Sequence, residues 1–475
     1  MPLVAGIDSS TQSCKVVIRD AETGALLRTG RASHPNGTEV NPAAWVAALS
    51  EAIEKAGGLD DVAALSIGGQ QHGMVLLDSE GRVIRDALLW NDTRSAEQAQ
   101  LLIEHFGAGY LASQTGSIPV ASFTSTKVLW VAQNEPENAA KIAAICLPHD
   151  YLTWRLAGYG PAGESQYGPD LTALATDVSD ASGTGYFSAR QRSYIAPIIE
   201  WILGRMPILP RVFSPAEAAY PADPNRVGFK GMLGAGAGDN AAAGFGVGAV
   251  NGDVVVSLGT SGTVFAVTDV ATADESGIIA GFASASGSYL PLVCTLNAAR
   301  ILDSFCGLLE VDHGELGELA LQAAPGSDGV VLLPYFEGER TPNLPDAKAS
   351  IHGLTLRNNT RANLARAAIE GMLCGLADGL AAMTAEGVRC NRVILVGGAA
   401  ENPAVQQIAA QVFGVEISVP KTGEYVADGA ARQAAWVALG TETKWNISTQ
   451  ASVPADTQPV ILQQYHSAFE SIHLG

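Results

Sequence analysis

The sequence predicts an α/β protein built from two domains. Its 475 residues are more than one hydrophobic core usually serves. Apolar residues make up 47% of the chain and aromatic residues only 6%, with 52 glycines, which is typical of a compact α/β protein and not of a disordered chain. Near the start of each half, a strand, a small polar turn and a second strand follow one another. This repeated order of elements indicates two domains with the same arrangement at their start.

The first half, residues 1–228, begins with strand patterns and continues with helical ones. Short strands are expected at 3–7, 14–19 and 26–33, with turns at 8–13 and 22–24. Apolar strand-like segments follow at 62–68 and 73–78, and helical patterns at 43–56, 93–105, 124–133 and 149–157.

A proline-rich stretch at 197–224 separates this half from residues 229–475, the second expected domain. Strands are expected near 229–235, at 253–258, 263–268 and 393–396, and helices at 239–248, at 361–385 and from 403 onward. The helix at 361–385 has the clearest pattern, because its apolar residues recur three or four positions apart. Residues 441–460 are expected to form a loop, with room for one short helix after it.

Composition excludes several classes of function. The net charge of −20 disfavours nucleic acid and anionic membranes as partners. The N-terminus lacks the basic region and cleavage site of a signal peptide, and no apolar run is expected to span a bilayer. The six cysteines form neither a C-x-x-C pair nor a metal-ligand spacing. We therefore expect reduced thiols in a cytoplasmic protein.

Two nucleotide-binding motifs can be set aside at once. The chain has no G-x-x-x-x-G-K-[ST] segment, so a P-loop enzyme is disfavoured. Residues 244–249, Gly-Phe-Gly-Val-Gly-Ala, fit the loose dinucleotide pattern of dehydrogenases. They lie in a helical stretch and not directly after a strand, which weakens that interpretation.

Three small-residue turns remain, each after a predicted strand, at 8–13, 259–262 and 397–400. Turns rich in Gly, Ser and Thr offer backbone N–H groups and hydroxyls that can surround phosphate groups. Each turn taken alone is more often an ordinary connection. Three of them in one chain, two of which echo each other, favour phosphate binding.

Two carboxylates adjoin glycine-rich or phosphate-type turns. Asp8 ends the first predicted strand, and Asp239 follows the segment 234–238, which contains three glycines. A carboxylate beside phosphates can hold Mg²⁺ or accept a hydroxyl proton. Each could equally cap a helix or turn, and for Asp239 the two interpretations are balanced.

Two polar clusters could bind a sugar. Gln70-Gln71-His72-Gly73 lies between two apolar segments, and its amides and imidazole suit hydroxyl groups. The second cluster, 90–94, joins the aromatic face of Trp90 to polar side chains. The first could instead be an exposed turn and the second a capped helix start.

At this point the sequence resembles the FGGY carbohydrate kinases over nearly its whole length. One family signature matches from Ser122-Phe123-Thr124 through Lys127 to Gln133-Asn134, and the other from Ala349 through Gly353-Leu354 to Glu370. Both are largely structural. The resemblance implies a two-domain actin/hexokinase-like, ribonuclease H-like ATPase fold, with the sugar and the nucleotide in a cleft between the domains.

The resemblance also implies roles for single residues. Asp239 would be the catalytic base, and Asp8 and Asp239 would hold Mg²⁺. The expected sugar ligands are Gln71, His72, Trp90, Asp239 and Asn240. The expected ATP ligands are Thr11, Gln12, Ser13, Lys15, Gly259, Thr260, Ser261, Gly262, Gly397, Gly398, Ala399 and Asn402. The loop Glu337–Pro342 would face the cleft.

Three segments resemble family members that phosphorylate D-xylulose in pentose catabolism, namely 70–73, 90–94 and 179–184. Gln71 departs from many of those members, which carry Met there. Another ketose or polyol (ribulose, erythritol, glycerol) stays an alternative substrate. A non-kinase ATPase or sugar sensor of the same fold is the alternative from another class.

Because the expected base and sugar ligands fall in different halves, we also expect sugar to favour domain closure. The quaternary structure is left open, with a homodimer among the alternatives.

Overall fold

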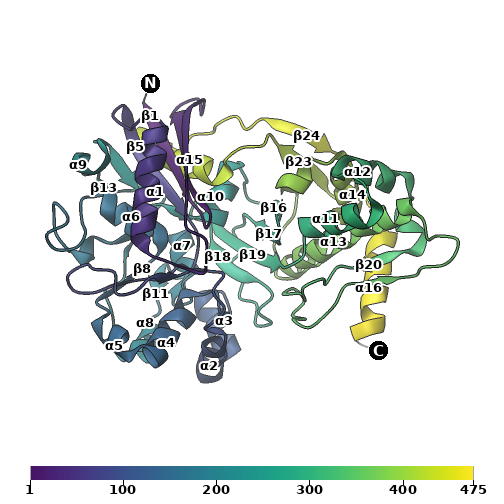
Figure 1. Ribbon diagram of the computed structural model, residues 1–475, viewed down its shortest axis with the longest axis horizontal. Helices are drawn as coiled ribbons and strands as arrows, with labels where there is room; N and C mark the ends of the chain where they lie inside the picture. Colours follow the sequence, from purple (N-terminus) through teal and green to yellow (C-terminus); the bar gives the residue numbers. More distant parts are fainter. Residues whose placement is uncertain (1, 474–475) are drawn as a thin grey trace. The chain divides into compact units, whose positions relative to one another are not determined.

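The computed structural model describes residues 2–473, which form two compact units (Figure 1). Unit 1 holds the residues up to Gly248 together with Ala273–Leu290 and Gly423–Asn446. Unit 2 holds Ala249–Thr272, Pro291–Thr422 and the residues from Ile447 onward. Each unit combines helices with a mixed sheet, as the α/β class predicted from the sequence requires.

The boundary expected at residue 228 is displaced from the one observed. Strands β14 (Met232–Gly234) and β15 (Ala237–Gly238) pair in parallel with β5 (Val62–Gly69), a strand of unit 1. Helices α10 (Asp239–Gly246) and α15 (Tyr425–Leu439) also belong to unit 1. The proline-rich stretch therefore lies within a unit, because the chain returns to the first sheet after it.

Unit 1 is organised around a sheet with the order β13-β14-β5-β1-β2-β3. Strand β1 (Leu3–Ser9) pairs in parallel with β5 and antiparallel with β2 (Ser13–Asp20), which continues antiparallel into β3 (Leu26–Ser33). Strand β13 (Ala218–Pro221) forms the other edge. The ends of β1, β5 and β15 thus lie together at one edge of the sheet, where Ser9 and Gly238 both pair with Gly69.

Alternation along β1 divides its side chains between two helical layers. Ala5 and Ile7 share a core with Trp45 and Leu49 of α1 (Pro42–Lys55). Val4 points to the other face, where it packs with Ala434 of α15. Figure 1 shows α1 along one face of this sheet. The sheet is therefore buried on both faces, which explains the apolar run of β1.

Unit 1 contains further helices and strands. They are β4 (Glu39–Val40), β6 (Val75–Leu77), β7 (Ala87–Leu88), α2 (Ala96–Phe106), α3 (Ala108–Thr115), α4 (Thr124–Asn134), α5 (Pro136–Lys141), β8 (Ala144–Cys146), α6 (Pro148–Leu156), β9 (Ala175–Asp177), α7 (Val178–Ser182), β10 (Phe187–Ser188), β11 (Ser193–Tyr194), α8 (Ala196–Leu203), β12 (Arg211–Phe213), α9 (Pro224–Val227) and β18 (Ala280–Ala283).

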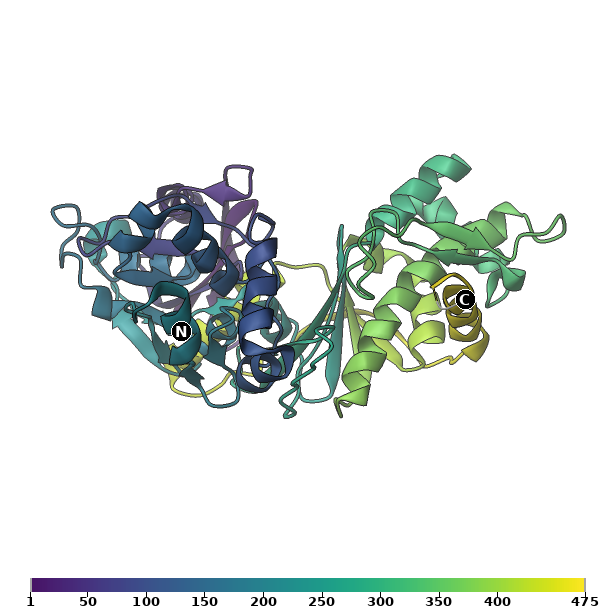
Figure 2. The same cartoon turned by 90° about the horizontal axis from the view of Figure 1, so that it is seen from below.

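Unit 2 has its own sheet, with the order β19-β17-β16-β22-β23-β24. Figure 2 shows the long helix α13 (Arg361–Ala385) alongside this sheet. The strands are β16 (Asp253–Leu258), β17 (Gly262–Ala266), β19 (Tyr289–Thr295), β22 (Arg392–Val396), β23 (Glu416–Pro420) and β24 (Thr449–Val453). The other elements are α11 (Ala299–Leu309), α12 (His313–Gln322), β20 (Val331–Leu333), β21 (Ser350–His352), α14 (Pro403–Phe413) and α16 (Pro459–His473).

Helix α13 corrects one expectation drawn from the sequence. By length and composition it could cross a membrane, although no apolar run was expected to do so. Most of its side chains are buried within unit 2, including Arg366 and Glu370, which form an ion pair at 2.6 Å. Its hydropathy therefore reflects its place in the core of unit 2.

Two further differences lie near the C-terminus. The expected loop at 441–460 contains β24, which pairs antiparallel with β23. The helix after it, α16, is 15 residues long and not short. The strand was missed because polar residues alternate along an exposed edge, where the apolar signal is weak.

Close helix packing explains the loose dinucleotide pattern at 244–249. A Cβ atom on Gly246 would lie 1.9 Å from the carbonyl oxygen of Tyr425, and one on Gly429 would lie 1.8 Å from that of Ala242. These glycines let the backbones of α10 and α15 touch. The pattern therefore marks a helix–helix contact, and the dehydrogenase interpretation has no support here.

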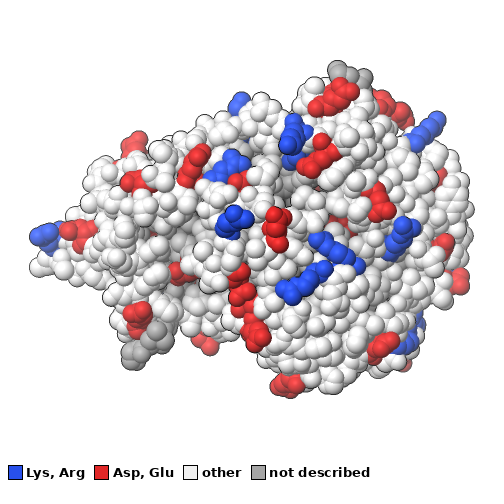
Figure 3. All heavy atoms as spheres, turned by 180° about the vertical axis from the view of Figure 1, so that it is seen from behind, with Lys and Arg blue, Asp and Glu red and all other residues white. Residues whose placement is uncertain are grey.

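Charge on the face drawn in Figure 3 is mixed. Lysine and arginine side chains are interspersed with acidic ones over that face. The net charge of −20 is therefore not gathered there into one acidic surface.

Candidate active site

Asp239 is the first residue of α10, directly after the β15 strand. Gly238 occupies the N-cap position, so Asp239 is not the cap that the alternative interpretation proposed. Its Oδ1 atom accepts hydrogen bonds from the backbone N–H of Asn240 at 2.8 Å and from Asn240 Nδ2 at 3.1 Å. Part of the residue's surface remains open to solvent. The carboxyl group is thus held at a helix start, in a residue that is only partly buried.

The amide of Gln71 meets this group from the end of β5. Asn240 Nδ2 donates to Gln71 Oε1 at 3.4 Å, and the Gln71 side chain packs so closely that a Cβ on Gly238 would lie 2.8 Å from Gln71 Cγ. Asp239, Asn240 and Gln71 therefore form one polar cluster within unit 1. This corrects the expectation that base and sugar ligands lie in different halves, and the closure argument loses that premise.

The environment of Asp239 favours proton transfer near neutral pH. Burial raises the pKa of its carboxyl group to about 7, outweighing the Asn240 hydrogen bond, which lowers it, and the charge of Asp8 adds to the rise. A carboxylate with a pKa near the working pH is suited to general-base catalysis. Asp8 pairs with Gly68 and Gly238 pairs with Gly69, so Asp8 and Asp239 flank the same end of β5.

Asp8 lies within β1 and not after its end, and it is almost completely buried. It accepts a hydrogen bond from Ser10 Oγ, and its Oδ2 atom lies 3.5 Å from Lys15 Nζ. Lys15 in turn pairs with Glu424 at 2.5 Å. Burial raises the pKa of the Asp8 carboxyl group, while Ser10 and Lys15 act to lower it. Lys15 is therefore part of a charge network on β2, next to the turn.

The turn at 8–13 keeps its polar groups accessible at the tip. Gln12 is exposed, and Thr11 accepts a hydrogen bond from Trp90 Nε1 at 2.8 Å. Ser13 is buried at the start of β2. Ser10 does not have a positive φ angle, so a side chain fits there without strain. The structure thus brings Trp90 to the predicted phosphate turn.

His72 is held in an unusual backbone conformation. Its φ angle is 67°, in the left-handed region that non-glycine residues seldom adopt. Its carbonyl oxygen accepts hydrogen bonds from Lys127 Nζ at 3.0 Å and from Thr124 Oγ1 at 3.2 Å, and its Nδ1 atom lies 2.5 Å from the carbonyl oxygen of Gly183. The ring also stacks on Phe123. Backbone strain supported by this many contacts is typical of functional sites.

The cluster at 90–94 divides between two roles. Trp90 is 44% exposed, so its ring face is available to a ligand. Asp92 is buried and accepts from Arg94 Nε at 2.9 Å and from Thr38 Oγ1 at 2.8 Å. Trp90 therefore offers an exposed aromatic face for a sugar, whereas Asp92 is buried and holds Arg94 and Thr38.

The two predicted nucleotide turns of unit 2 adjoin each other. Strands β16 and β22 pair in parallel, with Ser257 opposite Val396, so the turns at 259–262 and 397–400 follow the same sheet edge. A Cβ on Gly397 would lie 2.4 Å from the carbonyl oxygen of Leu258, and its φ angle is 100°. Thr260 and Ser261 are exposed at the tip of the first turn. Ala399 does not have a positive φ angle, so its side chain fits the turn without strain.

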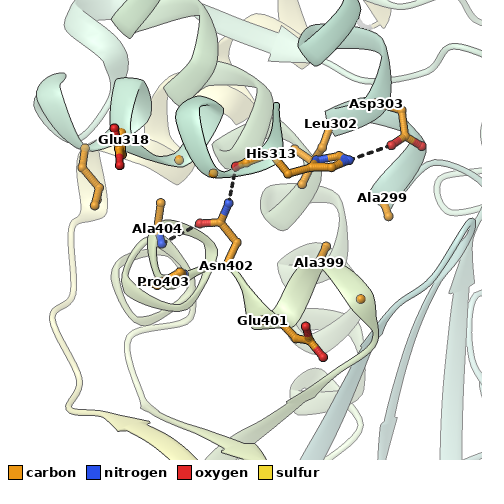
Figure 4. Close-up of a pocket in the computed structure, with 14 residues that line it drawn as sticks. Ala299, Leu302, Asp303, His313, Glu318, Ala399, Glu401, Asn402, Pro403 and Ala404 are labelled. Carbon is orange, nitrogen blue, oxygen red and sulfur yellow. Dashed lines mark hydrogen bonds and ion pairs between the residues drawn. The ribbon is translucent and has the colours of Figure 1, made fainter. Parts of the chain in front are cut away.

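A cavity of about 710 Å³ opens beside the second turn. Its walls come from α11, α12, α14 and the turn itself, and the lining residues include Leu302, Gly317, Leu321, Gly398, Ala399 and Asn402. Figure 4 shows Asn402 bridging the walls: its Nδ2 donates to the carbonyl oxygen of His313 at 2.6 Å and its Oδ1 accepts from Ala404 N–H at 2.9 Å. Asn402 therefore shapes this cavity.

Several contributors to the site escaped the sequence analysis. Glu424 and Gln433 reach it from the C-terminal segment of unit 1, where an alanine-rich helix carries little motif signal. Lys127 was noted only as part of a structural signature, yet it supports His72. A lysine in a buried signature could have indicated such a role, because buried lysines need partners.

Comparisons with known proteins identify the family of the chain. Residues 3–246 match the N-terminal domain of the FGGY family of carbohydrate kinases, and residues 254–438 match the C-terminal domain. The chain belongs to the FGGY family of carbohydrate kinases. The two-domain FGGY fold and the sugar kinase class expected from the sequence are thereby confirmed.

Relatives and solved structures of the family cover the chain almost completely. It is 43% identical over 451 residues to the xylulose kinase of Streptomyces rubiginosus, covering 93% of this chain and 89% of that one. It is 34% identical to the xylulose kinase of Escherichia coli, covering 90% and 89%. The crystal structure of xylulose kinase from Bifidobacterium adolescentis matches with a TM-score of 0.93 and 48% identity, covering 98% and 99%.

Proposed function

We propose that this enzyme transfers the γ-phosphoryl group of ATP to O5 of D-xylulose. The convergence of Asp239, Asn240 and Gln71 within unit 1 carries the proposal. A base and two amides side by side suit a polyhydroxy substrate whose primary hydroxyl is deprotonated during transfer. The 43% identity to a protein named xylulose kinase supports the choice of sugar.

Asp239 serves as the general base. As the O5–phosphorus bond forms and the bond from phosphorus to the ADP oxygen breaks, the hydroxyl proton passes to the Asp239 carboxylate. The raised pKa of about 7 suits this role, because a base should be ionised and yet able to accept a proton at neutral pH. Little covalent chemistry remains for the protein, so positioning decides the rate.

Gln71, His72, Trp90 and Asn240 bind the sugar. The amides of Gln71 and Asn240 already contact each other beside Asp239, and a sugar hydroxyl can share their remaining hydrogen-bond capacity. The exposed ring of Trp90 offers an apolar face to the carbon chain. The Gln71 amide, in place of the Met of many xylulose-specific relatives, adds hydrogen bonding to this pocket.

The residues proposed to bind ATP lie partly in unit 1 and partly in unit 2. In unit 2, the cavity beside Gly398, Ala399 and Asn402 is large and apolar enough for adenosine. The turns at 11–15 and 259–262 offer hydroxyls and N–H groups to the phosphates, through Thr11, Gln12, Ser13, Lys15, Gly259, Thr260, Ser261 and Gly262.

Asp8 and Asp239 fit a magnesium ion. Their oxygens are the ligands this cation prefers, both residues lie beside the end of β5, and burial makes each carboxylate costly to keep ionised without a cation. When bound, Mg²⁺ neutralises charge on the transferred phosphate. Lys15, 3.5 Å from Asp8, adds a fixed positive charge on the protein side.

A substrate panel tests the proposed activity directly. D-xylulose, D-ribulose, L-ribulose, erythritol and glycerol are assayed for sugar-dependent ADP release with saturating MgATP. We expect D-xylulose to give the highest kcat/KM. A clear preference for glycerol or a ribulose would reject D-xylulose as the substrate and leave the kinase class intact.

Removal of the His72 ring is expected to lower kcat/KM for D-xylulose. The loss should correspond to about 1–3 kcal/mol of transition-state stabilisation, the usual cost of a lost buried hydrogen bond. His72→Ala also places a Cβ at a φ angle of 67°. His72→Gly therefore serves as the matched variant, because it removes the ring without that strain. Equal kcat/KM in the wild type and His72→Gly would show that the ring does not bind sugar.

A further inference from the structure

A buried histidine outside the proposed catalytic set lies beneath the segment that carries Asp239. His149, at the start of α6, is completely buried. Its Nδ1 atom lies 2.7 Å from Asp180 Oδ2 and its Nε2 atom 3.2 Å from the carbonyl oxygen of Ala235. A neutral imidazole can donate from only one nitrogen. Both nitrogens face acceptors, and Asp150 Oδ1 also lies 3.2 Å from Nε2, so the surroundings favour the doubly protonated imidazolium, which can donate from both nitrogens.

The surrounding charges agree with this protonation state. Burial lowers the pKa of His149, but the carboxylates of Asp150 and Asp180 outweigh it and raise the pKa to about 10. His149, Asp150 and Asp180 could also be considered as metal ligands, since their ligand atoms lie within 4.8 Å of one another. In the structure these side chains form ion pairs with one another, with His149 Nδ1 2.7 Å from Asp180 Oδ2 and His149 Nε2 3.2 Å from Asp150 Oδ1.

Ala235, whose carbonyl oxygen faces His149 Nε2, belongs to the segment that leads to Asp239. Residues 234–238 consist only of glycine and alanine, so their backbone must be held by other parts of the chain. His149 contacts Ala235, Gln433 exchanges hydrogen bonds of 2.8 and 2.9 Å with Gly236, and Ser179 Oγ accepts from Gly238 N–H at 3.0 Å.

Gly236 is fitted to the histidine ring. Its φ angle is 87°, and a Cβ at this position would lie 2.2 Å from His149 Cδ2. The glycine therefore lets the backbone pass directly over the imidazolium. Any shift of the ring would be transmitted to the segment and, three residues later, to Asp239.

Helix α7 connects this support to the sugar-binding side. Asp180 and Ser179 both belong to α7. The carbonyl oxygen of Gly183, directly after this helix, lies 2.5 Å from His72 Nδ1. The short segment 179–183 therefore contacts both the backbone that leads to Asp239 and the ring of His72.

We propose that the His149–Asp180 ion pair, together with Ser179, is a positioning device that fixes the segment 234–238 and thereby the carboxylate of Asp239. The inference rests on the proposed role of Asp239 as the base. Its physical motive is that a misplacement of about 1 Å can cost roughly 10²-fold in rate.

The principal test is Asp180→Asn, which keeps the size of the side chain and an oxygen acceptor but removes the charge. We expect kcat to fall about 10- to 100-fold, while the Kd for D-xylulose changes by less than about twofold. His149→Gln should have a similar effect. The double variant should be no slower than the slower single variant, because the two residues act through one pair.

A matched control separates positioning from stability. Glu370→Gln removes the charge from another buried pair, with Arg366 in unit 2. We expect it to lower Tm, as Asp180→Asn does, and to leave kcat unchanged. Should Asp180→Asn fail to fold, Ser179→Ala removes one anchor of the segment without leaving a buried charge, and its kcat should fall about tenfold.

The results also distinguish this inference from the proposed function. If Asp239→Asn loses turnover while folded Asp180→Asn, or Ser179→Ala in its place, keeps kcat within about twofold of the wild type, the pair only stabilises the fold and the positioning inference is overturned. If Asp239→Asn itself keeps normal turnover, the base assignment fails, and the inference that rests on it fails for that separate reason.

Discussion

Asp239→Asn is expected to lower kcat about 10²–10⁴-fold, the usual scale for loss of a general base. The asparagine keeps the shape of the side chain and can still accept from Asn240 N–H, which now binds Asp239 Oδ1 at 2.8 Å. D-xylulose should therefore still bind, with a Kd close to that of the wild type. Steady-state kinetics and calorimetric titration with sugar measure the two quantities separately.

Asp20→Asn is the matched control for this substitution. Asp20 is also a largely buried aspartate of unit 1, but it accepts hydrogen bonds from the Thr23 turn at the far end of β2. Its substitution should leave kcat unchanged. Near-normal turnover in Asp239→Asn would show that another group accepts the hydroxyl proton.

Asp8→Ala is expected to raise the Mg²⁺ concentration needed for half-maximal activity by about 10- to 100-fold and to depress kcat. The substitution removes carboxylate oxygens and leaves Lys15 with Glu424 as its ion-pair partner, so the site becomes more positive. Titration of activity with Mg²⁺ at fixed ATP provides the measurement.

Asp8→Asn separates charge from coordination, because it keeps one oxygen that can accept from a metal-bound water. Its Mg²⁺ requirement should fall between those of the wild type and Asp8→Ala. A magnesium dependence that is the same in all three proteins would exclude Asp8 from the metal site.

The sequence predicted the parts of the site that depend on local chain chemistry. The turn at 259–262 connects two strands as expected, and the helix at 361–385 has the predicted bounds. Asp239 follows its glycine-rich segment at a helix start. These features depend on periodicity and turn composition, which short windows of sequence contain.

What the sequence could not predict depends on contacts between distant segments. The unit boundary was misplaced because β14 and β15 return to β5, a pairing that no local pattern specifies. The hydrogen bonds from Lys127 to His72 and from Trp90 to Thr11 join residues 55 and 79 positions apart. Side-chain partners at such separations follow from the assembled fold.

The placement of α15 has a consequence for the order in which the protein matures on the ribosome. This helix contacts β1 and α10, yet its residues, 425–439, are translated after nearly all of unit 2. Until they emerge, the face of the first sheet that carries Val4 and Gly6 lacks its cover, and the helix that begins with Asp239 lacks its glycine contact. Domains usually fold in the order of their synthesis. Here the N-terminal unit must wait for the C-terminal one to be translated, so the nascent chain exposes apolar sheet surface for most of its elongation.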